Sequence, residues 1–165
     1  SSNSAQSVNG GAVYLRYSSQ AFWSGKTTFA NNSAKQSGGG IMLYDECTLS
    51  WSEETIFSSN TAKNDSGGGV ALYNSSQAFW NGNTIFTNNR AGNNIGGAIA
   101  LLHGSTASGN AETTFTKNTA ISGGAICIVF NCTANFNGKT TFDANAASNR
   151  EGGALSIIFS NVCFG

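Results

Sequence analysis

Proline is absent from this chain of 165 residues, and only 10% of its residues are charged. The eight basic and eight acidic side chains give a net charge of zero, so nothing indicates an electrostatic partner such as a nucleic acid or an anionic membrane. No apolar run approaches the roughly 18 residues that span a bilayer. We therefore expect no membrane insertion of this segment. Its polar N-terminus is interpreted as a mature end or a cut fragment rather than a signal peptide.

Cysteine is also scarce. The four cysteines are too few for a disulfide scaffold, and no Cys-x-x-Cys pair or Cys/His cluster predicts a metal site or any other cofactor. The abundance of Asn, Ser, Thr and Gly could indicate a disordered polar tract. The 11 Phe and three Trp argue against disorder, provided that they recur in register.

Two motifs repeat with one period along the whole chain. A Gly-Gly pair followed by Ala or Gly and a branched residue occurs six times, beginning at Gly10, Gly38, Gly67, Gly96, Gly123 and Gly152. A second motif, Thr-x-Phe-x-x-Asn-x-Ala, recurs in step with it. Its aromatic and amide positions are Phe29, Phe57, Phe86, Phe115, Phe142, Asn32, Asn60, Asn89, Asn118 and Asn145. A shared period of 27–29 residues indicates stacked structural repeats.

Within each repeat the apolar residues alternate with a period of two, which is typical of strands rather than helices. Val13 and Leu15 share one face after the first Gly-Gly, Ala21 and Trp23 follow on a second segment, and the Thr-x-Phe motif forms a third. Three short strands and three corners per repeat predict an all-β fold: a parallel, right-handed β-helix of about six coils, forming a single domain over residues 1–165. A leucine-rich repeat would share the period, but leucine is too sparse here.

Stacking at roughly 4.8 Å would place equivalent side chains in columns. The Phe column becomes a stack of buried rings, and the Asn column becomes an amide ladder that also satisfies corner backbone groups. On the outer surface, Lys26 would lie beside Glu54 and Glu112 beside Lys139. These opposite charges on neighbouring strands fit the predicted register.

The paired Gly-Gly-Ala-Ile and Phe-x-x-Asn motifs resemble the repeats of the polymorphic outer membrane proteins of chlamydiae, from Asn3 to Leu155. Those proteins are autotransporters whose passenger is a β-helical adhesin. The resemblance implies surface display and adhesion, and hence an extracellular or cell-surface location.

Catalysis on a β-helix would need two or three convergent carboxylates. Glu54 and Glu112 share a column but should lie two coils apart, roughly 9–10 Å, and Asp45, Glu46 and Glu53 lie around the loops of one coil. We therefore predict no catalytic residues and no enzyme. An ice-binding surface is also disfavoured, because the regular Thr column shares the inward Phe face.

In the second predicted strand of each repeat, aromatic residues occur on both faces. Trp23, Trp51 and Trp80 share parity with small or aliphatic residues, which favours an inward stack over a sugar-binding stripe. Phe22 and Phe79 have the opposite parity and are the better candidates for an exposed contact.

Four N-x-[ST] sequons are candidate N-glycosylation sites. They are Asn31, Asn64, Asn74 and Asn131. Cys132 and Cys163 fall at similar places in adjacent coils, so we expect a disulfide between them. Cys47 is interpreted as a buried thiol or an intermolecular link, and Cys127 is expected on an outward face.

The outermost coils would expose strand edges whose backbone N–H and C=O groups are unpaired. Joining Phe164 to Asn3 and Ala5 of another copy nearly restores the Phe-x-x-Asn-x-Ala motif, which suggests head-to-tail stacking into a fibre. The first interpretation is thus a non-catalytic structural or adhesive solenoid, a stalk segment or fibre subunit whose partners are its own copies or further repeats. The second is an adhesin passenger that binds a host receptor or glycan, and the third is a polysaccharide-acting enzyme.

Overall fold

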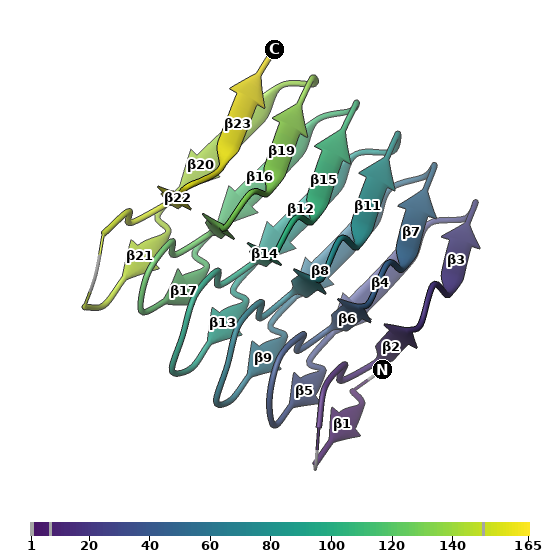
Figure 1. Cartoon of the computed structure of the whole chain (residues 1–165), viewed down its shortest axis with the longest axis horizontal. Coiled ribbons are helices and arrows are strands. Elements are labelled where there is room, and N and C mark those ends of the chain that lie inside the picture. The colour runs from purple at the N-terminus through teal and green to yellow at the C-terminus, as the bar shows by residue number, and fades with distance from the viewer. Residues whose placement is uncertain (1, 7, 150) are drawn as a thin grey trace.

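The computed structural model describes residues 2–6, 8–149 and 151–165, and within them every regular element is a β-strand (Figure 1). The strands form four parallel sheets, here called A to D in the order in which each coil visits them, and the coils stack along one axis. The predicted parallel β-helix of about six coils is confirmed. These ranges hold no helix of the length and apolarity needed to cross a membrane.

Each sheet takes one strand from every coil that reaches it. Sheet A contains β1 (Ser4–Ala5), β5 (Ser33–Ala34), β9 (Thr61–Ala62), β13 (Arg90–Ala91), β17 (Thr119–Ala120) and β21 (Ala146–Ala147). Sheet B contains β2 (Val13–Arg16), β6 (Ile41–Tyr44), β10 (Val70–Tyr73), β14 (Ile99–Leu102), β18 (Ile126–Val129) and β22 (Leu155–Ile158). Sheet C contains β3 (Gln20–Trp23), β7 (Thr48–Trp51), β11 (Gln77–Trp80), β15 (Thr106–Gly109), β19 (Thr133–Phe136) and β23 (Asn161–Phe164). Sheet D contains β4 (Thr27–Ala30), β8 (Thr55–Ser58), β12 (Thr84–Thr87), β16 (Thr113–Thr116) and β20 (Thr140–Asp143).

The number of strands per coil differs from the expected three. Sheet A is a fourth sheet, built from strands of only two residues that follow each ladder asparagine. Two residues are too few to show an alternating apolar pattern, so the period of two could not reveal this sheet.

One loop absorbs all the variation in repeat length. From the first Gly of each Gly-Gly pair to the sheet A alanine of the same coil the spacing is constant, as from Gly38 to Ala62 or from Gly96 to Ala120. The loop that runs from sheet A to the next Gly-Gly pair takes up the difference. Sheets B, C and D therefore stay in register, and Phe86 pairs with both Phe57 and Phe115.

The core combines aliphatic columns from sheet B, which include Ile41 and Leu72, with ring columns between sheets C and D. Phe57 and Phe86 are stacked with ring centroids 4.8 Å apart and 5° between planes, and Phe86 and Phe115 follow at 5.1 Å. These three rings are fully buried. Burying a phenylalanine contributes roughly 1.5–3 kcal/mol, so the column supplies much of the stability of the coil stack.

The asparagine column forms a continuous hydrogen-bonded ladder beside the rings. The Asn89 side chain donates to Asn118 Oδ1 at 3.0 Å and to the Phe57 carbonyl oxygen at 2.9 Å. Its own Oδ1 accepts from the backbone and side-chain nitrogens of Asn60, both at 3.0 Å. One buried amide thus satisfies groups in two neighbouring coils and closes the corner between sheets D and A.

Glycine is required where the chain enters sheet B. Gly67 has a φ of 67°, in the left-handed region that other residues avoid, and a Cβ there would overlap the Val70 carbonyl oxygen. Its neighbour Gly68 lies so close to the next coil that a Cβ would overlap the Gly97 carbonyl oxygen. The Gly-Gly pair therefore supplies a sharp corner and a close approach of neighbouring backbones.

The outer face of sheet B is covered, contrary to expectation. Cys127, expected on an outward face, is 0% exposed, and Met42, on the same face of an earlier coil, is 2% exposed. The first glycine of the Gly-Gly pair lies over this face, so a Cβ on Gly38 or Gly123 would overlap the Cβ of Met42 or Cys127. In the first coil the cover is incomplete, and Tyr14 is 39% exposed. Strand parity correctly separates the two faces of sheet B, but it cannot show that a loop buries the second one.

The tryptophan column packs inward, as its parity predicted, and each indole is anchored by a hydrogen bond. Trp51 Nε1 donates to the Thr84 hydroxyl and Trp80 Nε1 to the Thr113 hydroxyl, both at 2.9 Å. In the next coil Gly109 takes the place of a ring, and a Cβ there would overlap the Trp80 indole. The missing side chain leaves room for Trp80.

Loss of one rung of the ladder should destabilise the fold. We predict that Asn89→Ala lowers the free energy of unfolding by about 2–5 kcal/mol, because it leaves several buried partners without hydrogen bonds. Urea unfolding followed by far-UV circular dichroism measures this. Asn93→Ala, at an exposed position in the neighbouring loop, is the matched control and should change little. Equal effects of the two substitutions would contradict the ladder's role.

Adding one methyl group at Gly109 should also be costly. We predict that Gly109→Ala lowers the free energy of unfolding by about 1–3 kcal/mol, because the Trp80 indole must shift in a close-packed core. Gly25→Ala is the control, since no atom lies within 4 Å of a Cβ built at that position. Thermal unfolding monitored by tryptophan fluorescence compares the two, and an unperturbed Gly109→Ala variant would refute this packing.

Candidate functional site

Several acidic residues bond to groups in neighbouring coils instead of converging on one point. Glu54 pairs with Lys26 at 3.6 Å and Glu112 with Lys139 at 3.1 Å, at the corner between sheets C and D. Both pairs are well exposed, so each stabilises the fold by less than about 1 kcal/mol. They follow the predicted register.

Acids at other corners are held in the same way. Asp45 Oδ1 accepts a hydrogen bond from Asn74 Nδ2 at 2.9 Å, and Asp65 Oδ1 accepts one from Asn94 Nδ2 at 2.7 Å. Across the described ranges, no group of three or more His, Cys, Asp or Glu side chains could hold a metal ion. The arrangement of these carboxylates links coils together.

The expected disulfide between Cys132 and Cys163 is not formed, and this prediction is corrected. All four cysteines are free. Sheet pairing aligns Cys163 with Asn135 on the outer side of sheet C, whereas Cys132 lies at the buried corner three residues earlier in its coil. The two cysteines are therefore at different places around the coil. Cys47, like Cys132, is a buried thiol, each donating to a corner carbonyl oxygen at 3.1 Å.

Burial also changes the acidity of three internal groups. Desolvation raises the pKa of the Cys127 and Cys132 thiols and that of the Tyr73 hydroxyl. A raised thiol pKa lowers the fraction of nucleophilic thiolate, so Cys127 and Cys132 are poorly suited to covalent catalysis.

The candidate glycosylation residues lie at corners and loops. Asn31, Asn64 and Asn131 are exposed, and Asn31 and Asn131 adopt positive φ angles at corners of the coil. Asn74 is only partly exposed and is engaged with Asp45. Glycosylation at all four positions stays a prediction, with Asn74 the least accessible acceptor.

Exposed aromatic residues lie on sheet C and at the corner between sheets B and C, and the period-two pattern predicted only the first group. Phe22 and Phe79 project from sheet C with 66% and 38% exposure, as their parity predicted. A further aromatic column was missed at the corner between sheets B and C, where His103 stacks on Phe130 at 5.6 Å and Phe130 on Phe159 at 6.4 Å. These three residues have positive φ angles and lie outside the strands, so alternation could not reveal them. Their recurrence at the repeat period was the available signal.

A second amide ladder was also missed. Asn110 donates to Asn81 at 2.8 Å and Asn137 donates to Asn110 at 2.9 Å, at the exposed corner that follows sheet C. Its spacing matches the repeat period, but only three coils carry it. Like the first ladder, it stabilises coil stacking.

Comparison with known families agrees with this architecture. The family model described as "right handed beta helix region" matches residues 1–120. The model of the Chlamydia polymorphic membrane protein repeat matches residues 112–129, which contain Phe115, Asn118 and the Gly123-Gly124 pair. No curated protein and no solved structure matches the chain significantly.

The thiol arrangement can be counted in solution. We predict that one thiol per native chain, that of Cys163, reacts rapidly with 5,5′-dithiobis(2-nitrobenzoic acid), and that the other three react only after unfolding. Cys163→Ser should remove the fast phase, and Cys127→Ser should leave it intact. A native chain without a fast thiol would indicate that Cys163 is bonded after all.

Proposed function

Because this chain belongs to the right-handed β-helix family, we propose that it is a non-catalytic segment of a surface-displayed, autotransporter-like passenger with a structural and adhesive role. The match of residues 112–129 to the Chlamydia polymorphic membrane protein repeat supports surface association.

The main support for this proposal is that many of the carboxylates and amides bond between coils, and that two of the thiols are buried. Carboxylates at three corners bond across coils, the buried Cys127 and Cys132 thiols have raised pKa values, and the amides form ladders. The carboxylates and amides hold neighbouring coils together, which is the requirement of a stalk that presents a surface far from the cell. The outer surface remains free to carry recognition.

A stalk also needs its outermost coils covered. Leu101 and Phe136 are buried inside the stack, whereas their columns in sheets B and C end at the exposed Ile157 (41%) and Phe164 (45%). Half-buried Trp23 and Phe29 mark the other outermost coil. The proposed covering is a further repeat of the same polypeptide or another copy stacked head to tail into a fibre.

The second candidate role is recognition of a host receptor or glycan by the side of the solenoid. Phe22 and Phe79 project from sheet C, and Phe130 and Phe159 from the corner between sheets B and C. Exposed aromatic rings are suited to stacking on sugars or on apolar receptor surfaces.

Adhesion can be tested directly with the purified chain. Beads coated with it should bind cultured epithelial cells, and an excess of the soluble chain should compete for that binding because both present the same surface. Beads coated with serum albumin are the control. Binding at the albumin level would reject the adhesive role.

Two further readouts separate the remaining interpretations. Electron microscopy at high protein concentration should show filaments if copies stack, and only short dispersed particles would reject stacking. Turnover of a polysaccharide that is abolished by Glu54→Gln or Glu112→Gln would establish an enzyme and overturn the non-catalytic assignment.

A further inference from the structure

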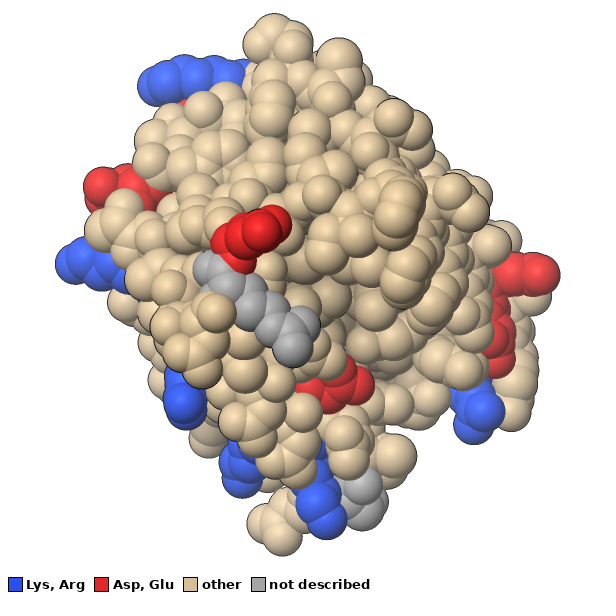
Figure 2. Space-filling view, turned by 60° about the vertical axis from the view of Figure 1, so that its left-hand side comes forward, with Lys and Arg blue, Asp and Glu red and all other residues tan. Residues whose placement is uncertain are grey.

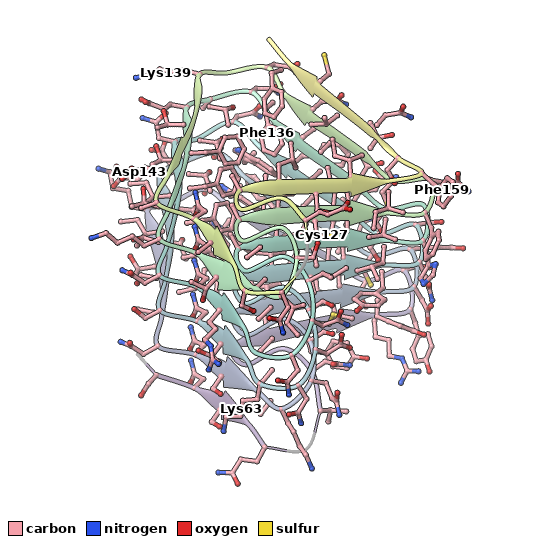
Figure 3. All side chains as sticks on the ribbon, turned by 90° about the vertical axis from the view of Figure 1, so that its left-hand side faces the viewer. Lys63, Cys127, Phe136, Lys139, Asp143 and Phe159 are labelled. Carbon is pink, nitrogen blue, oxygen red and sulfur yellow. The ribbon has the colours of Figure 1, made fainter. Side chains whose placement is uncertain are left out.

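Four basic residues form a diagonal row across sheet A. This basic row consists of Lys35, Lys63, Arg90 and Lys117, one from each of four consecutive coils, and all four are exposed. Lys35 and Lys63 directly follow β5 and β9, Arg90 begins β13, and Lys117 precedes ladder residue Asn118. With strands about 4.8 Å apart, the four coils place the ends of the row about 14 Å apart along the stack axis. Figure 3 shows Lys63 on the outside of the stack, and Figure 2 shows several Lys and Arg side chains along the left and lower edges of the molecule, with acidic side chains among those on the left.

The cations of the basic row are not neutralised by ion pairs within the part of the chain that the structure describes. The two ion pairs found there, Lys26–Glu54 and Lys139–Glu112, lie at another corner. Two carboxylates flank the row. Asp65 already accepts hydrogen bonds from Ser66 and Asn94, and Asp143 ends β20 in the coil next to Lys117. A strip of four cations thus remains available to an external anion, although the net charge of the chain is zero.

A hollow lies next to Arg90, toward the C-terminal end of the row, and extends over the coils of β13, β17 and β21. It measures ≈160 Å³, and its polar wall consists of Arg90, Thr119 and Ser148. Its floor is made of small residues, among them Gly92 and Ala120. A guanidinium presents a planar fork of donors that matches a sulfate or carboxylate, and two hydroxyls can add hydrogen bonds. The hollow is therefore suited to one anionic group of a longer chain.

The composition of sheet A indicates which class of polyanion could bind the basic row. Its strands contain only Ser, Ala, Thr and one Arg, so no aromatic ring can stack on a base, as single-stranded nucleic acids require. No apolar side chain on these strands is large enough to insert into a lipid interface. A row one residue wide fits a thin extended chain better than a flat bilayer. An anionic polysaccharide satisfies all three conditions.

We propose that the basic row and its hollow bind a linear sulfated polysaccharide of the glycosaminoglycan type, with Arg90 holding one sulfate and the three lysines following the chain. This inference rests on the adhesive role proposed above and gives it a ligand class. The polysaccharide crosses four coils, so its binding depends on the register of the solenoid.

Surface plasmon resonance on immobilised heparin tests the proposal. The double variant Lys63→Gln/Arg90→Gln should bind about tenfold more weakly than the native chain, because it loses one bidentate and one simple ion contact. The matched control, Lys26→Gln/Lys139→Gln, removes the same charge from the other corner and should change the affinity less than about twofold. Affinity should also fall steeply with added salt. Unchanged thermal unfolding shows that both variants remain folded.

Equal weakening by the two double variants would overturn the proposal, because it would show attraction without a site. The proposal also fails if fully desulfated heparin, single-stranded DNA or phosphatidylserine vesicles compete as well as heparin does. Cell-binding beads separate the two proposals. Beads that bind cells while the chain ignores heparin would reject the basic row alone, and heparin binding without cell binding would reject adhesion and leave the site standing.

Discussion

The constraint on which this structure depends is that each coil finds its backbone hydrogen-bond partners in the coils next to it. Thr84 N, for example, donates to Glu112 O, and Thr55 N to Asn83 O. A coil cannot satisfy these groups alone, so equivalent residues of successive coils must lie over one another at the strand spacing of about 4.8 Å. Identical side chains then meet, and the repeat selects residues that bind their own copies: rings that stack and amides that form ladders.

Side-chain columns add hydrogen bonds between sheets to these backbone hydrogen bonds between coils. Trp51 reaches across the core to Thr84 of the next coil, and Asn89 reaches back to the Phe57 carbonyl oxygen of the previous one. Because these bonds cross between coils and between sheets, displacement of one coil would break several columns at once. These columns use many of the buried polar groups, so the proposed recognition role falls to the outer surface and to places where the repeat is interrupted, such as Arg90 in the Ser/Thr column of sheet A.

Much of this fold could be predicted from the sequence, because ring and amide columns leave a direct trace in spacing: Phe57, Phe86 and their copies recur with the period of the Gly-Gly pairs. Other features leave none. Two-residue strands show no alternation, and the pattern of alternating residues does not show that the chain folds back over Cys127. The predicted Cys132–Cys163 pairing was wrong. The two cysteines follow their Gly-Gly pairs by similar numbers of residues, but Cys163 is aligned with Asn135 and not with Cys132. The net charge could not reveal the basic row, because it sums the charges of the chain and does not show where they lie.

The central claim is that side chains one repeat apart touch and those two repeats apart do not. Nuclear Overhauser contacts between selectively labelled phenylalanine rings test it most directly. The structure predicts contacts from Phe86 to both Phe57 and Phe115, whose ring centroids lie 4.8 and 5.1 Å away, and none between Phe57 and Phe115. Rings in unrelated surroundings, or a direct contact between Phe57 and Phe115, would contradict the stacked register and everything built on it.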